Sequence, residues 1–231
     1  MKTKVVSLLG GSVLATIIAA SCGQMNSSSS MSSMQGHSMH GSMMSNTESK
    51  WSASDLRTNL NALFGEHVLI AAVATSHALG GRQPAFEGAI GGLDANSIDI
   101  SKAIGAVYGA DAEKSFLPLW RKHIGFFVDY TVGVATKYKA KQDKAVNDLL
   151  GYADDLGAFL TSASPKLPKS TVAALVKDHI LTLKNVVDAQ AAREWPKVYA
   201  NLRMAASHMA MIADPLSMAI AQQFPDRYAQ R

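Results

Sequence analysis

The stretch LWRKHI at residues 119–124 occurs twice more in related form, as LFGEHV at 63–68 and LVKDHI at 175–180. The histidines of the three copies, His67, His123 and His179, are equally spaced along the chain. In each copy a leucine lies four residues before the histidine and an aliphatic residue follows it directly. Self-similarity at a fixed period is typical of a repeated supersecondary unit. We therefore interpret residues 52–226 as three copies of one unit.

The same shift aligns apolar residues further along each copy, at the spacing of one helix face. The aligned columns are Leu93, Leu149 and Ala205; Ile100, Leu156 and Ile212; and Ile104, Leu160 and Leu216. Helix-breaking residues divide every copy in two, at 80–84, 137–141 and 193–196. The sequence therefore predicts an all-α fold, a six-helix bundle of three αα-hairpin repeats of equal length at 53–108, 109–164 and 165–220. Asp111 and Ser170 are the expected N-caps of two of the helices.

Composition agrees with a globular helical protein and excludes several other classes. Of 231 residues, 48% are hydrophobic and 17% are charged, which is globular usage. Runs of β-branched residues are scarce, which disfavours an all-β fold. A net charge of +4 is too small to predict a nucleic-acid partner. The single cysteine excludes a disulfide scaffold and a cysteine-rich zinc site.

The N-terminal residues predict export and lipid anchoring. A short basic segment at 1–4 precedes an apolar segment at 5–20 of the length found in signal peptides. The sequence IAASC at 18–22 then reads as a bacterial lipobox, and it contains the single cysteine of the chain. We expect a signal peptide at 1–21, a lipid on Cys22 that anchors the protein to a membrane, and a location in the cell envelope, periplasmic or on the outer surface. Plain secretion with cleavage nearby is the alternative.

Residues 22–51 form a low-complexity segment that we predict to be a disordered tether. Residues 23–50 contain ten serines, six methionines and two histidines. Serine alone would serve as a spacer, whereas thioethers are soft ligands suited to Cu(I) and Ag(I), and imidazole suits copper as well. The stretch resembles the Met/His-rich segments of periplasmic copper-handling proteins. Copper binding and an inert spacer both remain open; the candidate ligands are Met34, His37, Met39, His40, Met43 and Met44.

The repeated histidines of the helical body allow two interpretations. If the hairpins are related by a rotation axis, His67, His123 and His179 can meet near it and form a metal or anion site. If each imidazole instead has a local structural role, it is half-buried and bonded to a neighbouring group. A linear stack of hairpins would keep the three side chains apart.

The last predicted helix carries a second group of candidate metal ligands. Met204, His208, Met211 and Met218 are spaced by four, three and seven residues, which places them on one helix face. Methionines at helical spacing more commonly fill a hydrophobic core, and we expect that role first. The histidine among them favours a soft-metal site as the alternative.

Known catalytic signatures are missing from the sequence, and we predict a protein that is not an enzyme. The sequence has no HExxH motif, no ExxH pair of the di-iron bundle type, no GxSxG motif and no P-loop.

The body resembles a family of secreted bacterial all-helical proteins that is loosely labelled copper-related, and copper amine oxidase-like in name only. The resemblance covers about residues 55–226 and rests on three features. They are Leu56-Arg57 with Leu60, Leu63 and Glu66-His67; WRKHIGFFVDY at 120–130; and QFP at 223–225. It implies a helical fold and an extracytoplasmic location, and it brings no established active site.

These observations support one functional hypothesis and one alternative. The first is an envelope lipoprotein that binds copper, or silver, for storage, delivery or tolerance. The alternative is a non-metal helical module of the cell envelope that binds a protein partner or an apolar small ligand.

Overall fold

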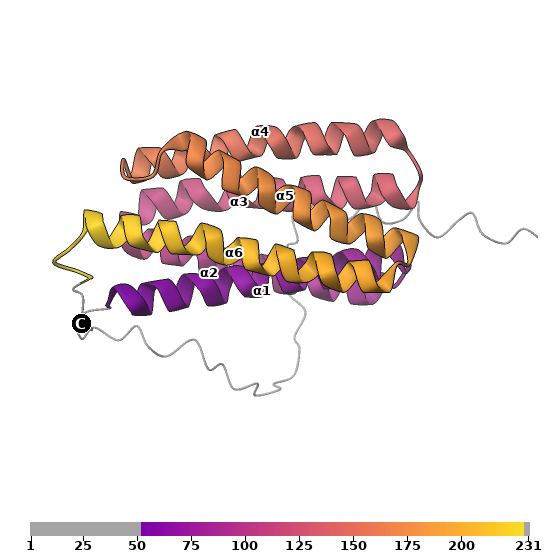
Figure 1. The fold of residues 1–231 in the computed structure, drawn as a ribbon, viewed down its shortest axis with the longest axis horizontal. Coiled ribbons are helices and arrows are strands. Elements are labelled where there is room, and N and C mark those ends of the chain that lie inside the picture. Colours follow the sequence, from indigo (N-terminus) through magenta and orange to yellow (C-terminus); the bar gives the residue numbers. More distant parts are fainter. Residues whose placement is uncertain (1–51, 229–231) are drawn as a thin grey trace, which may run out of the picture. The chain divides into compact units, whose positions relative to one another are not determined.

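The computed structural model describes residues 52–228 and contains six α-helices in that range. The signal peptide, Cys22 and the tether with its candidate ligands lie outside the described residues. The helices are α1 (Ala53–Leu79), α2 (Gln83–Tyr108), α3 (Ala110–Ala135), α4 (Lys139–Ala163), α5 (Lys169–Ala192) and α6 (Trp195–Gln223) (Figure 1). The prediction of an all-α six-helix bundle is confirmed.

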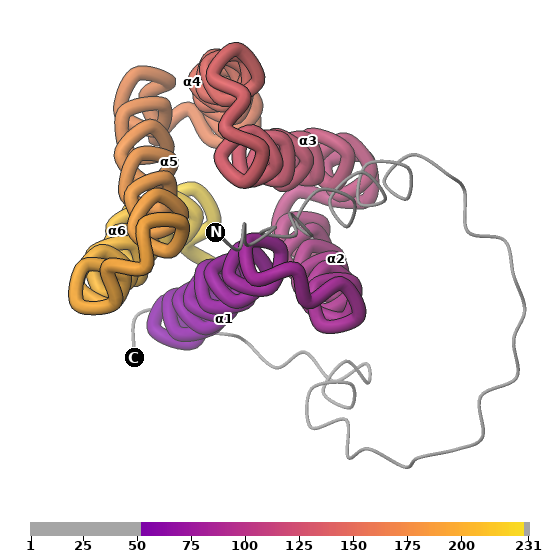
Figure 2. Tube along the Cα trace, turned by 90° about the vertical axis from the view of Figure 1, so that its right-hand side faces the viewer, coloured from indigo at the N-terminus to yellow at the C-terminus, as the bar shows by residue number. Residues whose placement is uncertain are grey.

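The helices form a closed ring with three of them meeting inside it. Each helix packs against the next one in the chain, and α6 returns to pack against α1 (Figure 2). In addition, α1, α3 and α5 contact one another in pairs. These are the first helices of the three predicted hairpins. This arrangement brings equivalent faces together, and it differs from a linear stack, in which the outer hairpins would not touch.

Local sequence accounts for where several helices begin and end. Ser52 caps α1: its Oγ accepts a hydrogen bond from the backbone N–H of Asp55, and the Asp55 carboxylate accepts one from the backbone N–H of Ser52. Both α2 and α6 have proline in their first turn, where a missing N–H costs no helical hydrogen bond. Gly80 ends α1.

The two predicted N-caps are each wrong by two residues. Helix α3 begins at Ala110 with Gly109 at its N-cap, and α5 begins at Lys169 with Pro168 at its N-cap. Asp111 and Ser170 therefore lie inside the first turns of their helices. Gly109 has a φ of 93°, which only glycine adopts easily, so the chain can turn there without a side-chain cap.

The aligned apolar columns lie in the core. Eight of the nine column residues are buried, and Ile212 is half-buried. A buried polar contact also links α1 to α5: Thr75 donates to the Gln190 side chain at 2.9 Å, and Gln190 donates to the Ala72 carbonyl at 2.9 Å. Because both partners would lose their hydrogen bonds if the helices slid, this contact fixes the register of α5 on α1.

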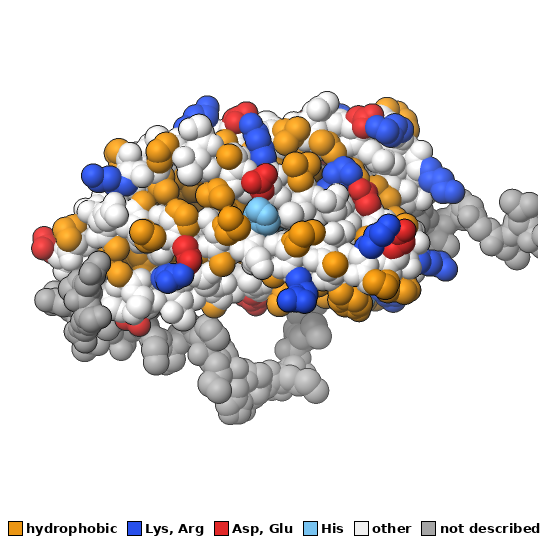
Figure 3. Space-filling model, viewed as in Figure 1, with side chains coloured by type: hydrophobic (Ala, Val, Ile, Leu, Met, Phe, Trp, Pro, Cys, Tyr) orange, Lys and Arg blue, Asp and Glu red, His pale blue; other side chains and the backbone are white. Residues whose placement is uncertain are grey.

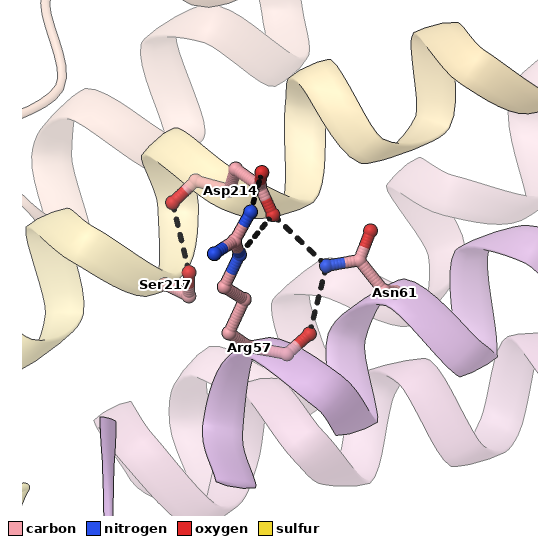
Figure 4. A network of polar contacts seen from close by, with 4 residues as sticks. All are labelled: Arg57, Asn61, Asp214 and Ser217. Atoms are coloured by element: carbon pink, nitrogen blue, oxygen red, sulfur yellow. Dashed lines mark hydrogen bonds and ion pairs between the residues drawn. The ribbon is translucent and has the colours of Figure 1, made fainter. Parts of the chain in front are cut away.

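A surface network joins the first helix to the last and closes the ring. Arg57 of α1 forms a two-bond ion pair with Asp214 of α6, and Asn61 donates to the same carboxylate at 2.9 Å (Figure 4). The Arg57 and Asn61 hydrogen bonds lower the pKa of Asp214. Ser217 donates to the Asp214 carbonyl, one turn back along α6. Because Arg57 is largely exposed, the network contributes more to the alignment of the helices than to stability.

Of the helices in the described range, α1 alone is long and apolar enough to cross a membrane, by length and composition only. One face of α1 is buried against the other helices of the bundle, as expected for a core helix.

Shortening one core side chain should lower the free energy of unfolding far more than shortening an exposed one. Leu149 belongs to an aligned column and is 1% exposed, whereas Leu69 is 53% exposed. Leu149→Ala should lower the free energy of unfolding by about 2–5 kcal/mol, because it leaves a cavity. Leu69→Ala should change it by less than about 1 kcal/mol. Urea unfolding followed by circular dichroism measures both; similar losses in the two variants would contradict this core.

Candidate interior histidine site

The three repeated histidines meet in the interior of the bundle. His67 comes from α1, His123 from α3 and His179 from α5, and they are 1%, 3% and 5% exposed. The Nε2 atoms of His67 and His123 lie 3.3 Å apart. The ring centroids of His67 and His179 are 6.2 Å apart. The structure thus brings together the side chains that the repeat aligned, and it buries them fully rather than by half.

Aromatic side chains surround the cluster of His67, His123 and His179. The Trp120 ring lies 5.0 Å from the His67 ring and 4.6 Å from the His123 ring, centroid to centroid. Tyr152 stacks on His123 at 4.8 Å. Phe64 and Phe116 in turn stack on Trp120. The imidazoles therefore lie in a region of low polarity, where an unsatisfied polar atom or a charge is costly.

Most ring nitrogens of the cluster have no hydrogen-bond partner. This holds for Nδ1 of His67, Nδ1 of His123 and both nitrogens of His179. A neutral imidazole carries one N–H and one lone pair. If one Nε2–H of the His67–His123 pair donates to the other Nε2, the accepting ring must carry its proton on Nδ1, where that N–H has no partner. Buried unpartnered groups of this kind are rare and destabilising.

Burial keeps the three imidazoles uncharged at neutral pH. It lowers the pKa of His123 to about 3 and the pKa of His179 to about 4. The pKa of His67 falls well below its ordinary value because of burial, followed by repulsion from His123 and from His179. Uncharged imidazole has the free lone pair that binds a metal ion.

Each histidine has a neighbour from the second helix of its own hairpin, at the same sequence separation in all three hairpins. Asn96 of α2 lies beside His67 and favours its protonated form, Tyr152 of α4 stacks on His123, and His208 of α6 lowers the pKa of His179. Asn96, Tyr152 and His208 therefore follow one another at the interval of the histidines themselves. Asn96 and Tyr152 were not predicted from the sequence. The signal that would have found them is the same repeat, three residues after the column of Leu93, Leu149 and Ala205.

Asn96 is oriented by two hydrogen bonds that leave its oxygen free. Its Nδ2 donates to the Leu63 carbonyl at 3.0 Å and to Glu66 at 2.9 Å. Its Oδ1 is buried and accepts no hydrogen bond of normal geometry, and neither does Nδ1 of His67 make one. Asn96 is therefore a fixed acceptor beside His67, and it favours the protonated form of that histidine.

The methionine face of α6 lies on the surface, so the expectation of a core role is wrong. Met204, Met211 and Met218 are about half exposed, whereas Met209, which is not on that face, is buried at 2% exposure. Spacing defines a shared face but not the direction it points. His208 lies between Met204 and Met211, is half-buried, and has a shielded, unpartnered Nδ1.

Within residues 52–228, no group of three or more histidine, cysteine, aspartate or glutamate side chains is close enough to hold a metal ion as it stands. The cluster therefore offers one close pair of nitrogens, His67 and His123, with His179 as the next imidazole.

Neither family models, curated proteins nor solved structures gave a match to this chain. The residues and their geometry are therefore the basis for inferring the function.

Replacing His179 by an apolar residue should stabilise the metal-free protein. Both ring nitrogens of His179 are buried without partners, so the folded state loses hydrogen bonds that water supplies in the unfolded state. His179→Leu should raise the free energy of unfolding at pH 7 by about 1–3 kcal/mol. Urea unfolding of the metal-free protein measures this. A decrease would mean that the imidazole has a structural role at this position.

The buried histidines should also make the protein unstable in acid. Their folded-state pKa values lie below the ordinary value of 6.5, so the unfolded chain binds protons that the folded chain does not. Stability is therefore full above about pH 6.5 and falls as the pH drops towards 4, by up to about 1.4 kcal/mol per pH unit for each such histidine. Urea unfolding between pH 7 and pH 4.5 measures the slope.

Variants identify the groups responsible for this slope. His179→Leu removes one of the buried histidines and should make the dependence on pH shallower. Ile180→Val alters the neighbouring core without removing a titrating group, and should keep the slope of the unaltered protein. Equal slopes in all three proteins would show that acid sensitivity has another origin.

Proposed function

We propose that the protein binds Cu(I) or Ag(I) in the cell envelope, for storage, delivery or tolerance, and that His67 and His123 form its interior binding pair. The observation that carries this proposal is the 3.3 Å approach of two uncharged, buried Nε2 atoms. The proposal assigns binding rather than catalysis to the protein. It also includes the predicted signal peptide, lipidated Cys22 and membrane anchoring.

The distance between the two nitrogens suits a shared metal ion. Two nitrogens each about 2.0–2.1 Å from one metal stand about 3.3–3.6 Å apart when the angle at the metal is between tetrahedral and trigonal. The observed 3.3 Å falls within this interval and is longer than an ordinary N–H hydrogen bond. Binding therefore requires little movement of either ring.

The surroundings of the pair favour the tautomer that a metal requires. A metal bound at both Nε2 atoms places the remaining proton of each ring on Nδ1. Asn96 lies beside His67, and the backbone of Trp120 lies beside His123, and each favours a proton on its histidine. Both are suited to accept a hydrogen bond from the Nδ1–H, the second-shell contact that metal-binding histidines usually have.

Charge and ligand number favour a monovalent soft ion over zinc. The cost of burying an ion rises with the square of its charge, and the aromatic wall around these uncharged imidazoles supplies no compensating anion. Structural zinc sites use four ligands, whereas Cu(I) and Ag(I) accept low coordination numbers. The methionines of the tether, if they bind metal, share the same preference for soft ions.

An apolar surface favours the second candidate function, a non-metal interaction module. Large apolar side chains are exposed along α6, and apolar atoms lie among charged ones on the face that α5 and α6 present (Figure 3). The exposed large apolar residues of α6 are Trp195, Tyr199, Met204, Met211 and Met218. Such a surface fits a protein partner in the envelope. Under this alternative, function would depend on the helical body and not on metal ligands.

A Cu(I) competition titration with a chromophoric chelator tests the proposal. Residues 23–231 and residues 51–231 should both compete for Cu(I), and the longer protein should bind more ions if the tether contributes. His67→Leu combined with His123→Leu should weaken binding by residues 51–231 at least about 100-fold, since removing even outer-shell partners costs 10–100-fold.

His77→Leu is the matched control for this titration. His77 is a half-buried histidine of α1 that accepts a hydrogen bond from Arg82 and lies outside the cluster. Its replacement should leave Cu(I) binding unchanged. Competition by the longer protein alone would place copper binding in the tether and remove it from the histidine pair. No competition by either protein would reject the copper proposal in favour of the interaction module.

A further inference from the structure

The turns inside the three predicted hairpins lie together at one end of the bundle. They join α1 to α2, α3 to α4 and α5 to α6, and successive helices run in opposite directions (Figure 1). We call the segments 80–84, 136–140 and 193–197 the tip. The start of α1 and the turns between hairpins lie at the opposite end.

The three turns of the tip have the same backbone geometry. Gly81, Lys137 and Arg193 are left-handed, with φ values of 67°, 56° and 59°. In each turn the next backbone N–H donates to the carbonyl five residues earlier, at 3.0, 2.8 and 2.9 Å. Glycine usually occupies the left-handed position of such a helix ending, because it adopts a positive φ without steric cost. Two of the three turns therefore have a long basic side chain where glycine would fit more easily.

Lys137 and Arg193 do not contribute to the packing of the bundle. Both side chains are exposed, and within residues 52–228 neither forms an ion pair or a side-chain hydrogen bond. A positive φ is uncommon for residues other than glycine, and residues held in such conformations cluster at functional sites. The two charges are therefore available to a partner outside the bundle.

The two ends of the bundle differ in charge. The tip contains five basic residues and one acidic residue, which gives it a net charge of +4: Arg82, Lys137, Lys139, Arg193 and Lys197 against Glu194. The opposite end contains three basic and three acidic residues, counted over 52–55, 108–111, 164–169 and 224–228. The tip is therefore the end that attracts an anionic surface.

The exposed aromatic side chains of the bundle lie at the same end. Within residues 52–228 they are Tyr138, Trp195 and Tyr199, each more than half exposed. Tyr138 and Trp195 belong to the tip, and Tyr199 lies one turn further along the same face of α6. The aromatic residues in the segments of the opposite end are buried or half-buried. Indole and phenol rings are favoured at the boundary between lipid and water.

We propose that the tip binds the surface of a membrane that contains anionic lipids. The basic side chains contact lipid phosphate groups, and Tyr138 and Trp195 enter the headgroup region. Charge alone would suit an acidic protein equally, whereas exposed aromatic rings beside the charges favour lipid. This inference goes beyond the proposed function, because it requires neither a bound metal ion nor a lipid on Cys22.

The predicted tether is long enough to permit this contact. Helix α1 has 27 residues and is therefore about 40 Å long. The 30 residues from 22 to 51 span at most about 100 Å when fully extended. A chain anchored at Cys22 can therefore bring the tip to the same membrane, although the tip lies at the far end of the bundle from residue 52. Two contacts with one membrane would strengthen each other.

Vesicle flotation with residues 23–231, which lack the predicted lipidation site, tests the proposal. The vesicles consist of phosphatidylcholine alone or of equal parts phosphatidylcholine and phosphatidylglycerol. The protein should float with the mixed vesicles at low salt and less at high salt, since salt screens the attraction. With Trp51→Phe, the emission of Trp195 should shift to shorter wavelength on binding. Trp120 is already buried and should not shift.

Paired variants locate the contact. Lys137→Gly combined with Arg193→Gly should weaken binding to the mixed vesicles by about tenfold or more. This pair should not lower the midpoint of thermal unfolding, because glycine adopts a positive φ easily. Lys166→Gln combined with Lys169→Gln removes the same charge from the opposite end. This control should keep the affinity within about twofold, because its charges are far from the membrane and screened.

Every other outcome would overturn the membrane contact. Equal weakening by the two pairs would mean that the vesicles attract the net charge of the protein and not the tip. Absence of flotation, or flotation without a shift of Trp195, would also reject it. Binding of polyglutamate that depends on the tip, without binding of vesicles, would assign the tip to an acidic protein. Cu(I) competition is measured separately, so that failure of either proposal is distinguishable from failure of the other.

Discussion

The structure depends on the mutual contact of α1, α3 and α5, which buries one imidazole from each at the same level of the bundle. A buried imidazole is tolerated only when it is uncharged, so this contact couples the protonation state of three side chains to the folded state. At neutral pH this coupling lowers the free energy of unfolding only slightly. It leaves the interior with free lone pairs, which is unusual in a hydrophobic core, where polar atoms are normally bonded.

The second helix of each hairpin gives its histidine a different chemical environment. Asn96 offers an oriented acceptor, Tyr152 a stacked ring, and His208 a further imidazole that reaches the surface. The three predicted hairpins thus have a histidine at the same position and differ in the residue beside it. The histidines are shared by all three hairpins, and the differences among their neighbours distinguish a closed interior pair from a more open third position.

The threefold repeat in the sequence was sufficient to predict the helices, the core columns and the histidine positions, because helical periodicity and burial act on every copy alike. The sequence could not predict that the three histidines meet. They meet because the helices close into a ring, whereas a linear stack of hairpins would have kept them apart. The exposed methionine face was mistaken for core because a spacing of seven defines a face without its direction. Asn96 and Tyr152 were not predicted because their aligned column contains three different residue types. The N-caps of α3 and α5 were predicted wrongly because Gly109 and Pro168 occupy those positions.

The packing of α6 against α1, with Asp214 held by Arg57 and Asn61, has a consequence for how such a chain can evolve. A linear array of repeats can lengthen or shorten by one copy without disturbing the others. A closed ring cannot: a fourth hairpin would widen the centre and draw the imidazoles apart, and loss of one would expose them to water. The closure therefore fixes the number of copies at three and leaves substitution within copies as the route for change.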